Sequence, residues 1–195
     1  MNKLEGIHIK KLFDPYFEAP LAVWEEFSNH MTYRSFKKNE IIKDIDQTEN
    51  FIDIIIKGSV GVFLWTDNNT KCLDLFYEDY FSGDFMSYLE NKPSELFTMS
   101  LEATEVFSIS KSKIAGLYGD NVMGLKIVSA ATESLFLHKQ KQQIDLLTKT
   151  AEERYHLMMK ENPELLQRTA SKHIASYLGV TPESLSRIKA KYVPG

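Results

Sequence analysis

Four polar residues near the carboxyl end of the chain lie at helical spacing and could read the edges of DNA bases. They are Thr181, Glu183, Ser184 and Arg187. An arginine presents a planar fork of N–H donors that matches the O6 and N7 acceptors of guanine in the major groove. Glu183 lies four residues before Arg187, so its carboxylate could accept from cytosine N4 or hold the arginine fork. We therefore expect base contacts from these residues. The alternative is a surface ion pair, which stabilises little.

Basic and hydroxyl side chains flank this segment and could bind the DNA backbone. Residues 168–195 contain five basic residues and one acidic residue, a net charge of +4; the whole chain carries −4, which leaves −8 for the rest. A basic tip on an acidic body is typical of a DNA-binding protein. Contacts to phosphate position a protein on the duplex without reading its sequence. The residues expected to make them are Arg168, Thr169, Lys172, Lys189 and Lys191.

Two short helices joined by a tight turn would hold these side chains in place. Gly179 permits the left-handed backbone that ends a helix, Thr181 is a good N-cap, and Pro182 suits the first helical position. The apolar residues that would pack the helices together are Ile174, Ala175, Leu178, Leu185 and Ile188. A helical hairpin with a solvated basic face is the alternative. The agreement of caps, turn and charge favours a DNA-binding helix-turn-helix.

Composition excludes several other classes of function. The chain has 195 residues and 43% hydrophobic content, enough for one large or two small packed domains. There is no bilayer-length apolar run and no signal peptide, so we expect a cytoplasmic protein without a membrane partner. The single cysteine, Cys72, excludes an internal disulfide and a cysteine-ligated iron–sulfur cluster. The five histidines lack metal-ligand spacing, and no P-loop, dinucleotide-binding glycine motif or nucleophile elbow is present. We expect neither a metal site nor an enzyme.

The rest of the chain divides into a β-rich part and a helical part. From Tyr33 to Ser110, short runs rich in Ile, Val, Phe and Tyr alternate with turn residues, which predicts a sandwich or barrel. Residues 121–149 contain no proline and predict one long helix of roughly 40 Å. A third helix, Ala151–Glu161, should end at Asn162-Pro163. We therefore expect three units: a β-rich domain of residues 1–120, a long connecting helix of residues 121–149, and a helix-turn-helix domain of residues 150–195.

The predicted long helix has apolar residues on more than one side, so it needs two covers. Its heptad-like row consists of Leu125, Val128, Thr132, Leu135 and Gln142. The β-rich part could cover one side and a second copy of the chain the other. The alternative is a monomer whose own domain covers the whole helix. We favour a homodimer, because a helix-turn-helix usually binds a pseudo-palindromic DNA site as a two-fold pair.

Several local strings resemble the family of the cyclic AMP receptor protein and the fumarate–nitrate reduction regulator, the Crp/Fnr family, over nearly the whole chain. Phe36-Lys-Lys-Asn-Glu-Ile-Ile resembles its strand F-x-x-G-E-x-I, and Ile54-Ile-Ile-Lys-Gly-Ser-Val its hairpin I-x-x-G-x-V. Phe81-Ser-Gly-Asp-Phe resembles the start of its phosphate-binding cassette, and Glu183 and Arg187 match its recognition-helix pattern E-x-x-x-R. The resemblance implies an α+β protein: an N-terminal cyclic-nucleotide-binding-like jelly roll, a long dimerisation helix and a C-terminal helix-turn-helix. It also implies an effector-sensing transcription regulator, with RNA polymerase as a further partner to consider.

The sequence departs from the family in the ligand pocket that the resemblance implies. Gapless counting places Ser94 and Glu95 where cyclic AMP-binding members have an Arg-Ser pair against the phosphodiester. Asp84 replaces the usual glutamate near the ribose, and Lys139 and Gln140 replace a Thr-Ser pair against the purine. The expected pocket residues are Ser82, Gly83, Asp84, Phe85, Ser94, Glu95, Lys139 and Gln140. A carboxylate at the anion position, without the bidentate donor, predicts that cyclic AMP is not used in the usual way. The effector, if one is needed, stays open.

Other interpretations remain. The sequence stops at Tyr192-Val-Pro-Gly, where the family continues into a β-hairpin wing, so we expect a trimmed winged helix with a shallower salt dependence of DNA binding. The protein could instead be a ligand-binding or protein-interaction module whose helix-turn-helix has lost DNA function. A jelly-roll metalloenzyme would need clustered histidines, and residues 31–137 contain none. A haem sensor would use a histidine such as His138.

Overall fold

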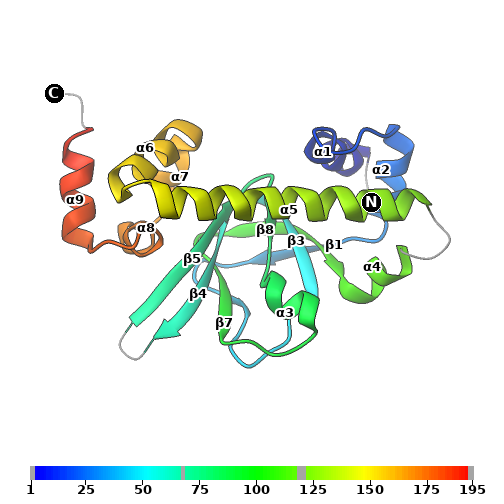
Figure 1. The fold of residues 1–195 in the computed structure, drawn as a ribbon. Coiled ribbons are helices and arrows are strands. Elements are labelled where there is room, and N and C mark those ends of the chain that lie inside the picture. The colour runs from blue at the N-terminus through cyan, green and yellow to red at the C-terminus, as the bar shows by residue number, and fades with distance from the viewer. Residues whose placement is uncertain (1–2, 67–68, 118–121, 193–195) are drawn as a thin grey trace.

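One long helix spans the molecule. In the computed structural model, which describes residues 3–66, 69–117 and 122–192, helix α5 (Val122–Thr148) runs along two antiparallel sheets (Figure 1). Helices α1 and α2 lie near its start, and α6 to α9 gather near its end. The other helices are α1 Lys3–Phe13, α2 Leu21–Ser28, α3 Phe85–Glu90, α4 Lys111–Leu117, α6 Ala151–Glu161, α7 Pro163–Arg168, α8 Ser171–Leu178 and α9 Pro182–Ala190.

The β-branched and aromatic runs between Thr32 and Ser110 form the predicted strands. The strands are β1 Thr32–Phe36, β2 Ile41–Lys43, β3 Phe51–Lys57, β4 Ser59–Thr66, β5 Asn69–Tyr77, β6 Phe81–Ser82, β7 Leu96–Ser100 and β8 Thr104–Ser110. One sheet has the order β1-β8-β3-β6 and the other β2-β7-β4-β5, with antiparallel pairing. Several neighbouring strands are distant from each other in the sequence. Two antiparallel sheets with such pairings are typical of a jelly roll. The predicted fold class is confirmed.

Two apolar clusters hold the jelly roll and its helices together. The buried residues between the sheets are Ile55, Val60, Val62, Phe76 and Val106. The second cluster joins α1 and α2 to α5: Trp24 is fully buried, its ring stacks on Phe13 at 4.8 Å, and Ile127 packs in the same cluster. Burying one large apolar side chain stabilises by about 1.5–3 kcal/mol. The N-terminal helices therefore hold α5 in position beside the sheets.

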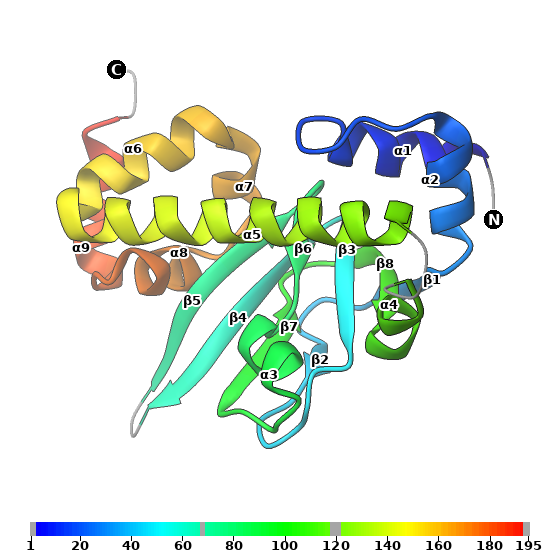
Figure 2. The same ribbon diagram turned by 45° about the vertical axis from the view of Figure 1, so that its right-hand side comes forward.

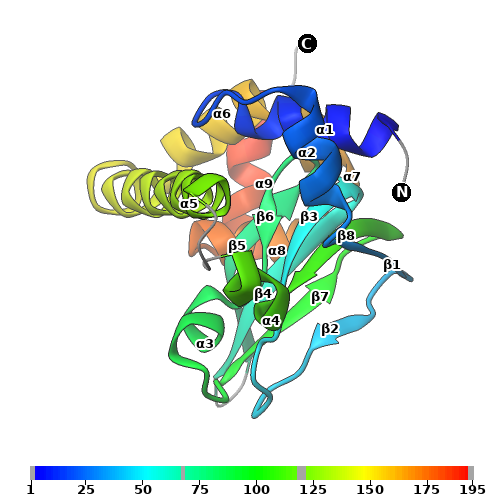
Figure 3. The ribbon, with the colours of Figure 1, turned by 90° about the vertical axis from the view of Figure 1, so that its right-hand side faces the viewer.

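Helix α5 has apolar residues on two sides, as its sequence predicts. Ile127 and Ala130 are buried against the body of the protein. A view along the helix axis shows α5 at the edge of the molecule, with the jelly roll on one side only (Figure 3). The exposed apolar residues of the helix are Val122, Leu125, Phe136, Leu137, Ile144, Leu146 and Leu147. This exposed apolar side has no cover in the described part of the chain.

The predicted heptad-like row does not stay on the exposed side. Leu125 and Thr132 are exposed and Val128 is half-buried, but Leu135 packs against the apolar cluster under α1 and α2. Gln142 hydrogen-bonds to Asp74 of the protein's own sheet. A straight helix has 3.6 residues per turn, so a seven-residue repeat drifts by about 20° per heptad. The prediction is therefore corrected at Leu135 and Gln142, which face the protein's own body.

Helices α8 and α9 form the predicted hairpin. Gly179, with a left-handed φ of 70°, ends α8, and the Thr181 hydroxyl accepts a hydrogen bond from the Ser184 N–H at 3.2 Å to start α9. The buried core of the unit consists of Tyr155, Ile174, Ala175, Leu178 and Leu185. Helix α6 has the predicted bounds, and Pro163 starts an additional short helix, α7, because proline suits a first turn. The predicted boundaries at 120 and 121 lie outside the described residues.

Candidate nucleic-acid interface and sensor cavity

The outer face of α9 carries the four residues expected to contact bases. Thr181, Glu183 and Arg187 are exposed, and Ser184 is half-buried. Arg187 Nη2 donates to Ser184 Oγ at 3.1 Å, so Ser184, rather than the expected Glu183, holds the guanidinium. Hydrogen bonds from its own backbone N–H and from the Thr181 hydroxyl keep the pKa of Glu183 below its ordinary value. This face therefore presents a carboxylate, hydroxyls and an arginine fork side by side.

Three of the five expected phosphate contacts lie on the surface of the same unit. Lys172 is exposed. Lys189 Nζ donates to Ser171 Oγ at 2.9 Å, and Lys191 Nζ lies 2.6 Å from Glu152 Oε2. Exposed contacts of this kind are weak, so these lysines can exchange their partners for a phosphate.

Arg168 and Thr169 are placed differently from the other three. The Arg168 guanidinium forms two hydrogen bonds to Glu78, of 2.9 and 2.7 Å, and its Nε lies 3.4 Å from Glu102. Thr169 is 5% exposed, and its hydroxyl has no hydrogen-bond partner among the described residues. One side chain is paired with the jelly roll and the other is buried. In this arrangement Thr169 is not available to a phosphate, and Arg168, whose side chain stays one-third exposed, must give up its carboxylate partners to reach one.

Helix α8 packs against β5, an edge strand, in a contact that the sequence did not predict (Figure 2). Ser176 Oγ accepts from the Cys72 N–H at 2.8 Å and donates to the Thr70 carbonyl at 3.3 Å. The His173 ring meets the Phe63 ring edge-on, with centroids 5.2 Å apart. Burial lowers the pKa of His173, which favours its neutral form at this contact. Ser176 and Cys72 are 104 residues apart, so no local pattern could reveal their pairing.

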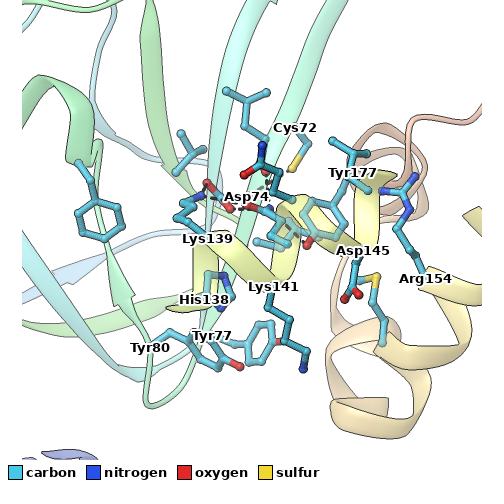
Figure 4. A pocket seen from close by; sticks show the side chains of 18 of the residues that line it. Cys72, Asp74, Tyr77, Tyr80, His138, Lys139, Lys141, Asp145, Arg154 and Tyr177 are labelled. Carbon is cyan, nitrogen blue, oxygen red and sulfur yellow. Dashed lines mark hydrogen bonds and ion pairs between the residues drawn. The ribbon is translucent and has the colours of Figure 1, made fainter. Parts of the chain in front are cut away.

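A cavity of about 820 Å³ opens between the jelly roll, α5 and the helix-turn-helix unit (Figure 4). The expected pocket residues that line it are Gly83, Asp84, Phe85 and Lys139. Ser82 is buried outside its lining, and Gln140 lies exposed on α5. Ser94 and Glu95 border a separate cavity of about 330 Å³. The structure therefore divides the expected pocket between two cavities and the surface.

Lys43, which the sequence analysis did not single out, lies where the cassette meets β7. Its side chain is 4% exposed, and its ammonium donates to Asp84 at 2.9 Å, Ser94 Oγ at 2.6 Å and the Leu96 carbonyl at 2.8 Å. These bonds use all three donors of an ammonium group. Ser94 also hydrogen-bonds to Asp84. Although burial raises the pKa of Asp84, the hydrogen bonds from Ser94, Ser87 and Lys43 hold it below its ordinary value. We call this group the Lys43 cluster.

Asp74 on β5 links the large cavity to the helix-turn-helix unit. It pairs with Lys139 (Figure 4), and it accepts a hydrogen bond of 2.8 Å from Gln142. Gln142 Nε2 also donates to the Tyr177 hydroxyl of α8 at 3.4 Å. One carboxylate thus connects the sheet, the long helix and the first helix of the helix-turn-helix. The sequence carries no signal for this network, because its members come from three separate elements.

The described part of the chain supports few other kinds of site. Among those residues, no group of three or more His, Cys, Asp or Glu side chains could hold a metal ion. No described helix is long and apolar enough to cross a bilayer. Cys72 is buried, and burial raises the pKa of its thiol, so it is not poised as a nucleophile.

Similar solved structures include several bacterial regulators. FixK2 from Bradyrhizobium japonicum is 22% identical, with a TM-score of 0.68, and the match covers 83% of each chain. The c-di-GMP-responsive regulator CLP from Xanthomonas campestris is 18% identical, with a TM-score of 0.67 over 90% of this chain and 96% of CLP. Catabolite activator protein from Thermus thermophilus is 18% identical, with a TM-score of 0.53 over 89% and 83%. No family model and no curated protein matches the chain. On its architecture and these likenesses, the chain has the Crp/Fnr-like fold that its sequence resemblance predicted.

Proposed function

We propose that the protein is a sequence-specific DNA-binding transcription regulator. The observation that carries this proposal is the outward face at the start of α9, where Thr181 caps the helix and Glu183, Ser184 and Arg187 follow it. The Arg187 fork makes a hydrogen bond to a serine hydroxyl, so it can turn toward a guanine without breaking a buried contact. FixK2, CLP and catabolite activator protein have similar folds, and CLP is a global regulator, which supports the same function here.

A homodimer formed along α5 would cover the exposed apolar side of that helix. Large apolar side chains exposed along one helix mark an interface. Leu125, Thr132, Phe136 and Leu147 lie on one face, because successive members are 7, 4 and 11 residues apart, and a second copy of α5 could cover them. Two copies would present two α9 helices to one DNA duplex. The proposal therefore includes a pseudo-palindromic operator with half-sites about one helical turn apart.

The jelly roll, residues 1–120, would sense an effector other than cyclic AMP, while 121–149 join it to the DNA-binding residues 150–195. An anion docking beside the cassette would meet the Asp84 carboxylate and an ammonium, Lys43, whose donors are already used. Freeing Lys43 would leave a buried carboxylate unpaired, which costs several kcal/mol. The large cavity, whose lining combines the hydroxyls of Tyr77, Tyr80 and Tyr177 with charged groups of both signs, is the better candidate for an effector that carries hydrogen-bonding groups.

The DNA proposal is tested by selection from a random duplex pool at moderate salt. The recovered duplex is then bound to Arg187→Ala and to the matched surface variant Lys172→Ala. Arg187→Ala should lose about 1–3 kcal/mol of discrimination at one base position. Lys172→Ala should weaken the binding of all DNA sequences alike, and it should reduce the slope of log K against log salt concentration by about one. If wild type recovers no motif and Arg187→Ala binds like wild type, a module with an inactive helix-turn-helix is the better description.

The effector proposal is tested by isothermal titration calorimetry. Cyclic AMP should show no micromolar binding, because its phosphodiester finds no free donor in the Lys43 cluster. The second titrant is c-di-GMP, to which CLP responds; as an anion it should also fail at this position. Micromolar binding of cyclic AMP that is lost in Ser94→Ala would contradict the proposed role of the Lys43 cluster.

A further inference from the structure

All three nitrogen atoms of the Arg168 guanidinium face carboxylates of the jelly roll. Nη1 and Nη2 donate to the two oxygens of Glu78 at 2.9 and 2.7 Å, and Nε lies 3.4 Å from Oε1 of Glu102. Two parallel bonds to two oxygens are the geometry in which arginine also binds phosphate. A side chain expected to bind the DNA backbone thus has its fork filled by its own chain. We call this contact the carboxylate clamp.

The two carboxylates of the clamp are held in place without Arg168. Glu78 Oε1 accepts from the Gly58 N–H at 2.8 Å, and Glu102 Oε1 accepts from the Ser59 hydroxyl at 2.9 Å. Gly58 has a φ of 96°, and a Cβ there would come within 2.6 Å of another side chain, so this turn requires glycine. Although burial raises the pKa of Glu78, hydrogen bonds from Arg168 and the Gly58 N–H bring it below its ordinary value. Glu78 and Glu102, which accept hydrogen bonds from the turn between β3 and β4, therefore form a preformed anionic receptor for a guanidinium.

The clamp belongs to a wider contact between the helix-turn-helix unit and the jelly roll. Asn162 Nδ2 donates to the Tyr77 hydroxyl at 2.6 Å, and Ser176 bonds to the backbone of β5. Thr169, next to Arg168, has a buried hydroxyl without a partner among the described residues. A buried, unpaired hydroxyl is unfavourable, and exposure of Thr169 would relieve it. The ion pairs of Arg168 thus stabilise the docked arrangement, whereas the unpaired hydroxyl of Thr169 destabilises it.

We propose that Glu78 and Glu102 act as an internal substitute for DNA phosphate, which keeps Arg168 docked on the jelly roll until DNA competes for it. This inference rests on the proposed DNA-binding function and names a contact that regulates it. One guanidinium cannot bind the clamp and a phosphate at the same time. The two carboxylates also repel a nearby polyanion while Arg168 is absent. DNA binding through Arg168 therefore requires this edge of the unit to open.

The test uses the full chain with Glu78→Gln and Glu102→Gln, singly and together. Glutamine keeps an oxygen acceptor for the Gly58 N–H and for the Ser59 hydroxyl, but it removes the charge that holds Arg168. Glu164→Gln is the matched control. Glu164 is an exposed residue of α7 whose charge affects the pKa of Arg168, so its replacement changes the net charge as each single clamp substitution does but leaves the clamp in place. The first measurement is fluorescence anisotropy with the selected operator. The second, without DNA, is hydrogen exchange of the Cys72 amide, which donates to Ser176 in the docked arrangement.

The clamp variants should bind the operator about five- to tenfold more tightly than the Glu164→Gln control. This change lies at the lower end of the range that is typical of coupling between two sites. Their Cys72 amide should exchange faster than in wild type and in the control. A gain in affinity no larger than that of Glu164→Gln overturns the inference, and so does unchanged exchange at Cys72. If neither wild type nor any variant binds a duplex, the proposed function fails. The exchange rates then show on their own whether Glu78 and Glu102 hold the unit closed.

Discussion

Replacing Lys43 by methionine should destabilise the protein strongly, although no ligand is present. The substitution keeps the length of the side chain but removes the ammonium that binds Asp84, Ser94 and the Leu96 carbonyl. Removing one partner of a buried ion pair costs about 3–5 kcal/mol, because the other charge stays buried. Asp84 is 1% exposed and would keep its hydrogen bonds from Ser87 and Ser94, so we expect the lower end, about 3 kcal/mol. For a chain of this size that loss lowers Tm by about 6–12 °C.

Urea unfolding at pH 7, followed by circular dichroism, measures this loss. The double variant Lys43→Met/Asp84→Asn should recover at least half of it, because no charge then remains buried. Lys141→Met, which breaks an exposed ion pair with Glu161, is the control and should cost less than about 1 kcal/mol. The pKa of Asp84 is held low, so its ionised form stabilises the protein above the ordinary aspartate pKa of about 4, and this contribution is lost as the pH falls through the lowered pKa. The reasoning is refuted if Lys43→Met costs under 1 kcal/mol or if Asp84→Asn restores nothing.

Three further outcomes are expected. Phe136→Glu with Leu147→Glu should turn the proposed dimer into monomers in sedimentation velocity runs, since both side chains are exposed on α5; a persistent dimer would place the interface elsewhere. Burial lowers the pKa of His173, so the unfolded state binds its proton more readily, and the protein should lose stability as the pH falls below about 6.5; His173→Phe should flatten this part of a Tm-against-pH curve. Thr181→Ala removes the N-cap bond to Ser184, which should cost about 1 kcal/mol in urea unfolding.

The helix-turn-helix was predictable from the sequence because its signals are local. A glycine at a left-handed turn, a capping threonine and a proline in the first turn act within a few residues of one another. The same holds for α6, whose capping threonine and Glu153 lie three residues apart. The jelly roll followed from regularly spaced strand patterns, whereas its strand order needs pairings between distant segments.

The candidate site was predictable only where its residues share one element. The α9 face was found because helical spacing places Glu183, Ser184 and Arg187 together. Gapless counting from the cassette places Ser94 and Glu95 at the family's anion position, but it cannot show that Lys43 of another strand donates to Ser94 there. The predicted row on α5 assumes 3.5 residues per turn. A straight helix has 3.6, so Leu135 of this row faces the protein's own core and not the exposed side.

The sequence by itself determined which part of the chain is β-rich and which is helical, where the helix-turn-helix begins and ends, and where the basic charge collects. These properties depend on neighbours within one or two turns of the chain. Only the tertiary structure decided that Lys43 neutralises the cassette, that Arg168 lies in a clamp of carboxylates, and that α8 completes the edge of β5. The partners in each contact are 41, 90 and 104 residues apart. Charged and hydrogen-bonding groups at such separations come into contact only when the whole chain has packed. Short-range sequence patterns cannot show which distant group will lie beside a given residue.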